Sequence, residues 1–399
     1  MISMSRWDGQ ISSASWSLAK ELGKTNQVYY VDYPYTWMDY RRERSLASVK
    51  SRKSALLKGK NATKLLFEHE GGFVKAITPK LVLPINWASP GKLYNKLSQI
   101  NNSIVAQSIQ DALAEDGIRE FIFWNSFNPT YLYDPKALLK PTFTVYHSRD
   151  AIGAINEFTR KHGQYLEILA IQNADLAIAT SQSLSDDLSE FSGKKVHLFP
   201  NGGDTDLFKK AWTESATVPQ DLVKIPKPMI GYTGNVCQRI DYELLKSLAE
   251  SHPDKSIVLV GPREDKQHTS IDLDSITNIY FTGPKKIDQL PEYLRWFDCV
   301  IIPFKCNELT RSIYPLKINE YLAAGKSVIT TSFSPDIQSF KDVIRVANSK
   351  EEFIHMIEAA LTDNSALLNE LRYKKTEENS WSHRVELFWQ LAFDTYQQL

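Results

Sequence analysis

The sequence predicts an α/β protein of two domains, each built on a parallel sheet that helices cover on both faces. Three observations support this fold class: short β-branched or apolar runs alternate with longer helical patterns, the alternation occurs twice, and 399 residues suffice for two domains. A polar, proline-containing stretch at about 204–228 separates the halves and is interpreted as the linker. We therefore expect a first domain over 1–205, a second over 226–380 and a terminal helix over 381–399.

The individual elements follow from local periodicity and flanking turn residues. In the first half, strands are expected at 2–5, 27–32, 121–124, 143–146, 176–179 and 195–199, with helices at 12–22 and 155–173. In the second half, strands are expected at 229–232, 256–260, 279–282, 299–303 and 327–331. The tail at 382–399 has helical periodicity in its apolar residues, so one of its faces should be buried.

Composition narrows the class of protein. Lys plus Arg and Asp plus Glu both total 47, so no net charge favours nucleic acid as a partner. No apolar run approaches the roughly 20 residues of a membrane span, and the first residues show no signal-peptide pattern. Cys237, Cys299 and Cys306 lack the spacing of metal ligands and fit a reducing compartment. We expect a cytoplasmic protein that is soluble or peripheral to a membrane.

Glycine, proline and cationic residues follow the strands of the second half. The carboxyl ends of parallel strands meet at one edge of a sheet, where open α/β sheets bind ligands, and two such domains leave a cleft between these edges. Glycines let backbone N–H groups approach a ligand closely. A diphosphate could be neutralised there by Arg239, Arg263, Lys285 and Lys317. Neither a G-x-G-x-x-G after the first strand nor a P-loop is present, which argues against an NAD-type dehydrogenase.

The stretch at 314–331, YPLKINEYLAAGKSVITT, predicts a short helix followed by a strand. Ser312 can cap the helix, Pro315 suits its first turn, and Gly325 can end it in a left-handed turn. The helix N-terminus could hold a phosphate while Glu320, one turn further in, accepts hydrogen bonds from sugar hydroxyls. The other interpretation is an ordinary α/β helix with a surface glutamate.

Taken in order, GYTGNVCQRIDYELL, IVLVGP, IYFTGP, FDCVIIPF and PLKINEYLAAGKSVITT resemble the donor domain of GT-B glycosyltransferases, close to family 4. In the first half, RWDGQISSASWSLAKEL, VYHSRD and HLFPNGGDTDLF are similar to the same family. The resemblance implies two Rossmann-like doubly wound domains that face each other across a cleft. It also implies that the C-terminal helix crosses back to pack on the first domain.

The resemblance assigns donor-binding roles to individual positions. It implies that Glu320 binds the ribose of the donor, that Gly234 and Asn235 form the glycine loop beside the phosphates, and that Arg239 and Arg263 contribute more weakly. The diphosphate contact falls on the turn Tyr314, Pro315, Leu316 and Lys317. Many family members carry a second glutamate where this chain has Ser312, and Glu308 is out of register. Whether transfer retains or inverts the anomeric configuration is therefore left open.

Three residues of the first half are candidates for the catalytic base. His147 and Asp150 follow the strand at 143–146; the histidine matches retaining family members, and the aspartate matches the inverting glucuronosyltransferase type. We favour Asp150, because VYHSRDAIG resembles the Y-x-x-x-D pattern of that type. Asp8 is an alternative base, and the neighbouring Gly9 is interpreted as a residue that allows the turn. The other interpretation is that His147 and Asp150 are polar loop residues that cap the next helix.

The segment 33–64 combines basic and aromatic residues. From Arg41 to Lys64 there are nine cations and one carboxylate, Glu43, and Tyr33, Tyr35, Trp37 and Tyr40 precede them. Such a segment suits an anionic membrane surface or a polyprenyl diphosphate acceptor. A solvated mobile loop, or aromatic stacking on acceptor sugars, would explain the same composition.

The sequence thus predicts a glycosyltransferase that transfers a sugar from a nucleotide-sugar donor, UDP-sugar in particular, to a glycan or lipid-linked acceptor of a bacterial surface polysaccharide or glycolipid. We expect no metal ion and no cofactor beyond this donor, because helix amides and cations could stabilise the leaving diphosphate. The alternatives are a UDP-sugar epimerase or hydrolase of the same fold and a nucleotide-sugar-binding protein without catalysis.

Overall fold

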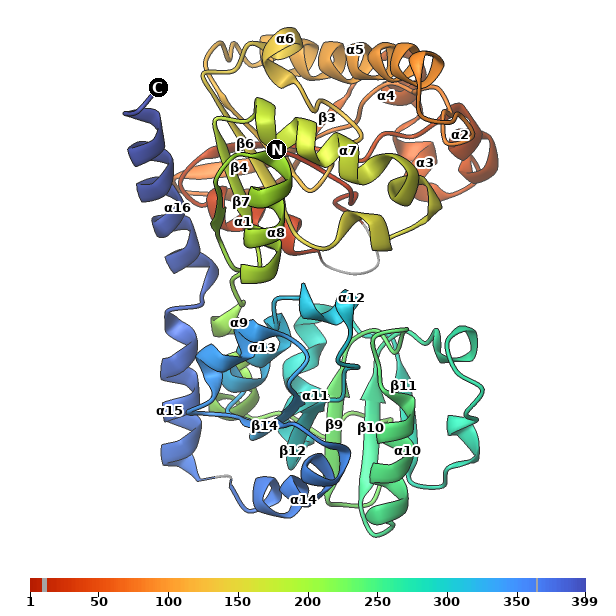
Figure 1. The fold of residues 1–399 in the computed structure, drawn as a ribbon, viewed down its shortest axis with the longest axis vertical. Helices are drawn as coiled ribbons and strands as arrows, with labels where there is room; N and C mark the ends of the chain where they lie inside the picture. The colour runs from red at the N-terminus through yellow and green to blue at the C-terminus, as the bar shows by residue number, and fades with distance from the viewer. Residues whose placement is uncertain (9–12, 364) are drawn as a thin grey trace. The chain divides into compact units, whose positions relative to one another are not determined.

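The computed structural model describes residues 1–8, 13–363 and 365–399, which form two compact units. Unit 1 comprises Met1–Pro200 and Val385–Leu399, and unit 2 comprises Asn201–Arg384. Each unit is a sheet of mainly parallel strands with helices packed against it, so the predicted α/β class of two doubly wound domains is confirmed (Figure 1). Among the described residues, no helix combines the length and the apolar character that crossing a membrane requires.

The sheet of unit 1 is parallel except at one edge. Its strands lie in the order β3-β4-β2-β1-β5-β6-β7-β8, and only β3 runs antiparallel to its neighbour. Their bounds are β1 Ile2–Ser3, β2 Gln27–Val31, β3 Thr63–His69, β4 Gly72–Ile77, β5 Ile122–Ser126, β6 Phe143–Ser148, β7 Leu176–Ala179 and β8 Val196–Leu198. The hairpin β3–β4 was not predicted, because β3 is a largely exposed edge strand without the apolar alternation that marks a buried one.

The helices of unit 1 pack against this sheet, and three of them, α2 to α4, lie within the basic segment 33–64. Their bounds are α1 Ala14–Leu22, α2 Trp37–Glu43, α3 Ala47–Ser51, α4 Lys53–Lys58, α5 Lys92–Glu115, α6 Pro135–Leu139, the 3-10 turn Ile152–Ala154, α7 Glu157–Asn173 and α8 Gln182–Ser192. Helices α2 to α4 make up much of the basic segment, for which a solvated mobile loop was the other interpretation. The Thr36 hydroxyl and the Asp39 carboxylate form a capping box that begins α2.

The C-terminal helix α16, Trp381–Tyr396, belongs mainly to unit 1. Phe388 is buried and its ring lies 4.2 Å from that of Trp124, measured between centroids. Aromatic burial of this kind accounts for the apolar face of the tail, because each such ring removes a large apolar area from water.

Unit 2 has an entirely parallel sheet with the strand order β11-β10-β9-β12-β13-β14. The strand bounds are β9 Met229–Thr233, β10 Ser256–Val260, β11 Ile279–Gly283, β12 Cys299–Ile302, β13 Val328–Thr331 and β14 Arg345–Ala347. The helix bounds are α9 Thr205–Thr213, α10 Tyr242–Ser251, α11 Leu290–Trp296, α12 Glu308–Arg311, α13 Leu316–Ala323, α14 Lys350–Leu361 and α15 Ala366–Glu377, with 3-10 turns at Asp265–Gln267, Leu273–Ser275, Ile287–Gln289 and Pro335–Phe340. The short strand β14 was not predicted.

The stretch interpreted as a linker is part of unit 2. It contains α9, whose Phe208 has no exposed surface, and the Trp212 Nε1 group donates to the Ala323 carbonyl of α13 at 3.0 Å. The polar and proline-rich composition at 204–228 therefore reflects the solvent face of α9 and the loop after it. The interpretation of the whole stretch as a linker was wrong.

Candidate functional site

Two glycines bring the ends of β9 and β10 into close contact in unit 2. Gly234 has a φ of 138° and Gly261 a φ of 151°, a region that favours glycine. A Cβ on Gly261 would lie 2.0 Å from the Gly234 carbonyl oxygen, and a Cβ on Gly234 would lie 2.5 Å from Lys317 Nζ. The Gly234 N–H donates to the Val260 carbonyl at 2.8 Å, which fixes this loop. The predicted glycine loop thus lies directly against α13.

Asn235 follows Gly234 in this loop, and only one of its two side-chain amide atoms has a hydrogen-bond partner. Its Nδ2 donates to Glu264 Oε1 at 2.9 Å, and its carbonyl accepts from the Tyr232 hydroxyl at 3.1 Å. The buried Asn235 Oδ1 has no hydrogen-bond donor among the described residues. An unsatisfied buried acceptor costs about 1–3 kcal/mol, so a ligand N–H or O–H at this position would be stabilising.

Helix α13 begins differently from the prediction. Its N-cap is Pro315, which offers no side-chain hydrogen bond to the first turn. Ser312, expected as the cap, instead ends α12, and its Oγ donates to the Leu309 carbonyl at 3.1 Å. The Leu316 N–H donates to the Tyr314 carbonyl at 2.8 Å, whereas the Lys317 N–H, next in the first turn, has no side-chain cap and suits the oxygen of an anion. Gly325, with a φ of 72°, follows the helix as predicted.

The neighbouring Tyr314 fixes the turn before α13. Its side chain is 6% exposed, and its hydroxyl accepts from Asn319 Nδ2 at 3.1 Å. This residue therefore supports the helix start from within the core of unit 2 and does not present its hydroxyl at the surface.

Lys317 and Glu320 are half-buried charges on α13 that do not pair with each other. No ion pair within 4.0 Å joins either of them to a described residue. Burial lowers the pKa of the Lys317 amine, although Glu320 acts in the opposite direction. Burial likewise raises the pKa of the Glu320 carboxyl, against the effect of Lys317. A desolvated cation and a desolvated carboxylate, one turn apart, are able to bind a phosphate and a pair of hydroxyls.

Two of the four cations predicted to face a diphosphate are already neutralised. Arg263 donates to both oxygens of Asp265 at 3.0 and 2.8 Å and to both oxygens of Asp274 at 2.7 and 3.2 Å. Lys285 pairs with Asp221 at 2.7 Å. Arg263 and Lys285 are therefore engaged in ion pairs in this structure, and their role at a diphosphate stays a prediction.

Arg239 remains a candidate for an anion contact. It lies on the loop after β9, with its guanidinium carbon 5.9 Å from the centre of the Phe304 ring and its Nε donating to the Cys237 sulfur at 3.3 Å. Its carbonyl accepts from the Lys305 N–H at 2.9 Å, which ties this loop to the end of β12.

In unit 1, His147 lies in an aromatic core on β6. It has no exposed surface, and its ring packs edge-on against Phe199 at 5.5 Å between centroids. Arg149 Nη2 lies 3.3 Å from His147 Nδ1, and because arginine only donates, Nδ1 accepts. The pKa of His147 lies well below its usual value, because burial disfavours the charged ring and Arg149 repels it. Because His147 has no exposed surface in this structure, it is a weaker candidate base than Asp150, and its role stays a prediction.

Asp150 follows β6 and Arg149 at the carboxyl edge of the sheet and is exposed. Burial lowers the pKa of the neighbouring Arg149 guanidinium to about 10, and the charge of Asp150 acts against that shift. Arg149 Nε donates to Ser126 Oγ at 3.1 Å. Asp150 is therefore the one of these two candidates that a substrate could reach.

Asp8 is held by a network of charges. Arg52 donates from Nη1 to Asp8 Oδ2 at 2.7 Å and from Nε to Asp32 Oδ2 at 3.1 Å. Asp32 has no exposed surface, and burial raises its pKa in spite of the charge of Arg52. Asp8 is thus an ion-paired carboxylate and a weaker candidate base, while Gly9 lies outside the described residues. Sequence reasoning missed Arg52, because it stands in a basic run that reads as a solvated surface.

The sequence contains two D-x-D tripeptides, at 204–206 and 272–274, a motif that other glycosyltransferase folds use to hold a metal ion. Asp274 is engaged by Arg263, and the Asp272 side chain accepts from the Asp274 N–H. Asp204 is the residue before α9, and Asp206 lies in the first turn of that helix. The Tyr373 hydroxyl donates to Asp206 Oδ1 at 3.4 Å. Within the ranges that the structure describes, no three His, Cys, Asp or Glu side chains gather in a way that could hold a metal ion.

Comparison with known proteins identifies a glycosyltransferase family match within unit 2. Residues 227–363 match the family described as Glycosyl transferases group 1. A Bacillus subtilis (strain 168) protein, provisionally named teichuronic acid biosynthesis glycosyltransferase TuaH, is 29% identical over 185 residues. The match spans 45% of this chain and 45% of TuaH, so it covers about half of that relative.

Solved structures show the same fold over most of the chain. Sucrose-phosphate synthase from Thermosynechococcus elongatus has a TM-score of 0.65 at 12% identity, covering 100% of this chain and 99% of that one. An α,α-trehalose-phosphate synthase (UDP-forming) from Burkholderia xenovorans, in complex with glucose-6-phosphate, has a TM-score of 0.66 at 11% identity, covering 98% of each chain. Anabaena HepE in complex with UDP has a TM-score of 0.57 at 15% identity, covering 80% of this chain and 86% of that one. The chain therefore has the GT-B fold, and its residues 227–363 match the family Glycosyl transferases group 1.

Proposed function

We propose that this protein transfers a sugar from a UDP-sugar to a glycan or lipid-linked acceptor in the synthesis of a bacterial surface polysaccharide. The match to the group 1 family supports a nucleotide-sugar donor, and TuaH is named for teichuronic acid biosynthesis. The UDP complex of HepE and the UDP-forming synthase support uridine as the nucleotide.

The observation that supports this proposal most directly is the pair Lys317 and Glu320 beside Gly234. The Lys317 amine lies against the glycine loop without an ion-pair partner among the described residues, where a diphosphate would neutralise it. Glu320 lies one turn further along α13, where its carboxylate could accept from the two ribose hydroxyls. As the bond to the sugar breaks, negative charge grows on the diphosphate, and Lys317 with the α13 amides would stabilise it.

Replacing Glu320 with glutamine should weaken UDP binding about tenfold, because the amide accepts hydrogen bonds less strongly than a carboxylate. Isothermal titration with UDP, compared with deoxyuridine diphosphate, measures the effect. The deoxynucleotide lacks one ribose hydroxyl, so the substitution should matter less for it.

Glu308→Gln is the matched control for this experiment. Glu308 is exposed on the short helix α12, and its substitution should leave UDP affinity unchanged. Equal UDP affinity of the Glu320→Gln variant and the unchanged protein would contradict the ribose role. Incubation with UDP-sugars and lipid extract then separates transfer from hydrolysis, epimerisation or binding alone, according to the product.

Transfer should persist in excess EDTA, because Lys317 and the α13 amides supply the positive charge that a metal ion would otherwise provide. The measurement is the initial rate of sugar transfer before and after chelation. Loss of activity that Mn²⁺ restores would contradict this expectation and would draw attention to the aspartates of the two D-x-D tripeptides.

The exposed cations of α2 to α4 support a peripheral membrane contact at the cytoplasmic face. A cavity of about 530 Å³ is lined by Tyr40, Arg44, Lys50 and Lys53 together with Ser45 and Val49, and it has no carboxylate in its wall. Trp37, Met38 and Leu46 are 52%, 65% and 52% exposed in the same segment. Arg42 and Arg52 do not contribute, because both are paired with carboxylates.

The triple variant Arg44→Gln, Lys50→Gln, Lys53→Gln should lose sedimentation with anionic vesicles, since each basic residue near such a surface contributes about 1 kcal/mol. The control variant Lys92→Gln, Lys96→Gln, Lys140→Gln removes the same charge from exposed positions elsewhere in unit 1. Equal sedimentation of the two variants would contradict a specific basic surface.

A further inference from the structure

Two hydroxyls of β6 donate to one carboxylate of α7 in unit 1. The hydroxyl oxygens of Tyr146 and Ser148 lie 3.0 and 2.8 Å from Glu167 Oε1. Alternate residues of a strand point to the same face of the sheet, so one side chain on a covering helix is able to contact both. All three side chains are buried. The end of β6, two residues before Asp150, is therefore attached to α7.

The same helix contacts the chain again, two residues after Asp150. Gly163 lies one turn before Glu167 on α7, so both residues are on the same face of the helix. A Cβ on Gly163 would lie 2.8 Å from Cγ1 of Ile152, which is 3% exposed. Ile152 is β-branched and has little freedom to change its rotamer. A side chain at position 163 would therefore displace the 3-10 turn that Ile152 begins.

Hydrogen bonds to the backbone also hold the residues just before Asp150. The Thr180 N–H donates to the Ser148 carbonyl at 3.1 Å, and the Thr180 hydroxyl donates to the Arg149 carbonyl at 2.7 Å. Thr180 directly follows β7. The chain is thus held immediately before Asp150 and again two residues after it, and α7 provides a contact on both sides.

Glu167 acts as a hydrogen-bond acceptor and not as half of an ion pair. No ion pair within 4.0 Å joins Glu167 to a residue of the described chain. Burial raises the pKa of its carboxyl to about 7, against the effect of the two hydroxyl donors. Both hydroxyls donate to the same oxygen, so a neutral acceptor of the same shape could replace the carboxylate.

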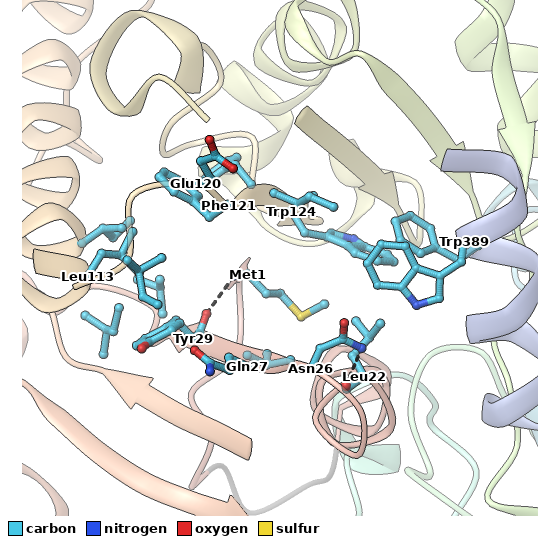
Figure 2. A pocket seen from close by; sticks show the side chains of 18 residues that line it. Met1, Leu22, Asn26, Gln27, Tyr29, Leu113, Glu120, Phe121, Trp124 and Trp389 are labelled. Atoms are coloured by element: carbon cyan, nitrogen blue, oxygen red, sulfur yellow. Dashed lines mark hydrogen bonds between the residues drawn. The ribbon is translucent and has the colours of Figure 1, made fainter. Parts of the chain in front are cut away.

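A cavity of about 280 Å³ in the same unit does not explain this buried carboxyl. It lies at the beginnings of β2 and β5, at the edge of the sheet opposite to Asp150 (Figure 2). Its wall includes Leu22, Leu113 and Trp389 but, among the described residues, none from β6 or α7. A ligand in that cavity would therefore not contact Glu167.

We propose that Glu167 and Gly163 are positioning residues for sugar transfer: together they hold the turn that carries the Asp150 carboxylate, which takes the proton from the acceptor hydroxyl. This role rests on the proposed transfer function, with Asp150 as the base. A base acts only within hydrogen-bond reach of the proton, so a displacement of about 1 Å lowers the rate by up to about 10²-fold. Both residues belong to unit 1, so UDP binding at α13 of unit 2 should not change.

Gly163→Ala tests the contact with Ile152. It should lower kcat for transfer about 10- to 100-fold and leave the KM for the UDP-sugar within about twofold. Alanine has a higher helix propensity than glycine, which offsets part of the strain on the fold. Gly153→Ala is the matched control. Gly153 is exposed in the same turn, and a Cβ there meets no atom within 4 Å, so kcat should not change.

Glu167→Gln and Glu167→Leu test the hydrogen bonds. The amide oxygen of glutamine accepts from both hydroxyls, so kcat should stay near normal, whereas leucine accepts from neither and kcat should fall about tenfold. In a Ser148→Ala background the loss from Glu167→Leu should be smaller, because one of the two donors is already absent. Should the leucine variant not fold, Gly163→Ala decides the outcome.

Hydrogen exchange in the peptide that covers 145–155 tests the positioning without turnover. Exchange should be about tenfold faster in Gly163→Ala and Glu167→Leu and unchanged in Gly153→Ala and Glu167→Gln. If the unchanged protein transfers no sugar, the proposed function fails, and exchange alone then decides whether α7 holds this turn. Normal kcat and normal exchange in Gly163→Ala would overturn the proposal. Equal losses in Glu167→Gln and Glu167→Leu would overturn it as well, since a charge and not an acceptor would then be needed.

Discussion

Replacing Lys317 with methionine should weaken UDP binding roughly 10- to 100-fold, the largest loss that we expect from a substitution in unit 2. The Lys317 amine lies 2.5 Å from the position of a Cβ on Gly234, and it has no ion-pair partner within 4.0 Å among the described residues. A bound diphosphate would be its counter-charge. Isothermal titration with UDP measures the loss, and transfer should fall at least as much, since the charge on the leaving group is greatest in the transition state.

This substitution should not destabilise the fold. Burial lowers the pKa of the Lys317 amine, so folding disfavours its charged form. Because the folded-state pKa is below that of the unfolded chain, the cost is present at neutral pH and disappears only as the pH rises through the unfolded value. Methionine removes the charge and keeps most of the side-chain volume. The melting temperature at pH 7 should therefore stay the same or increase.

Lys285→Met is the control, for which we expect the opposite effects on stability and on UDP affinity. Lys285 pairs with Asp221 at 2.7 Å, so its loss should cost stability, by about 1 kcal/mol, and leave UDP affinity unchanged. If Lys285→Met weakens UDP binding as much as Lys317→Met, the site that we assign to α13 is wrong. Full UDP affinity of the Lys317→Met protein would contradict it equally.

The placement of the proposed donor-site residues could be predicted in part, because they form two pairs that are each local along the chain. Gly234 and Asn235 directly follow β9, and Lys317 and Glu320 lie three residues apart on α13, so turn and helix geometry place them. The ion pairing of Arg263 could not be predicted in the same way. Its charge is balanced by Asp274, eleven residues further on, and nothing in the local pattern selects that partner.

The surroundings of the candidate bases in unit 1 depend on contacts between residues that are far apart in the sequence. His147 is buried because Phe199 and Trp124 pack against its ring, and Phe388, from the C-terminal helix, packs on both of these. No spacing around His147 reveals those neighbours. Arg52 is a similar case, since its partners Asp8 and Asp32 lie 44 and 20 residues away. Composition identified the basic segment. Only the tertiary structure shows that Arg52 is buried while other cations of the segment are exposed.

Replacing Asp150 with asparagine should reduce sugar transfer by about 10²- to 10⁴-fold while sparing UDP binding. Asparagine keeps the size of the side chain but cannot take a proton from the acceptor hydroxyl. Asp150 is exposed at the carboxyl edge of the sheet of unit 1, whereas His147 on the same strand has no exposed surface. Transfer rate, UDP affinity and melting temperature should be measured on one preparation, so that a folding defect cannot imitate a catalytic one.

Asp8→Asn is the comparison that decides between the two carboxylates. It weakens the ion pair with Arg52, so we expect a lower melting temperature and only a modest loss of transfer. A large loss of transfer in Asp8→Asn, with a normal rate in Asp150→Asn, would move the base to Asp8. If both variants transfer sugar at the unchanged rate, the proton leaves the acceptor without either carboxylate. The anomeric configuration of the product, determined by NMR, then separates that outcome from the inverting mechanism that Asp150 as the base requires.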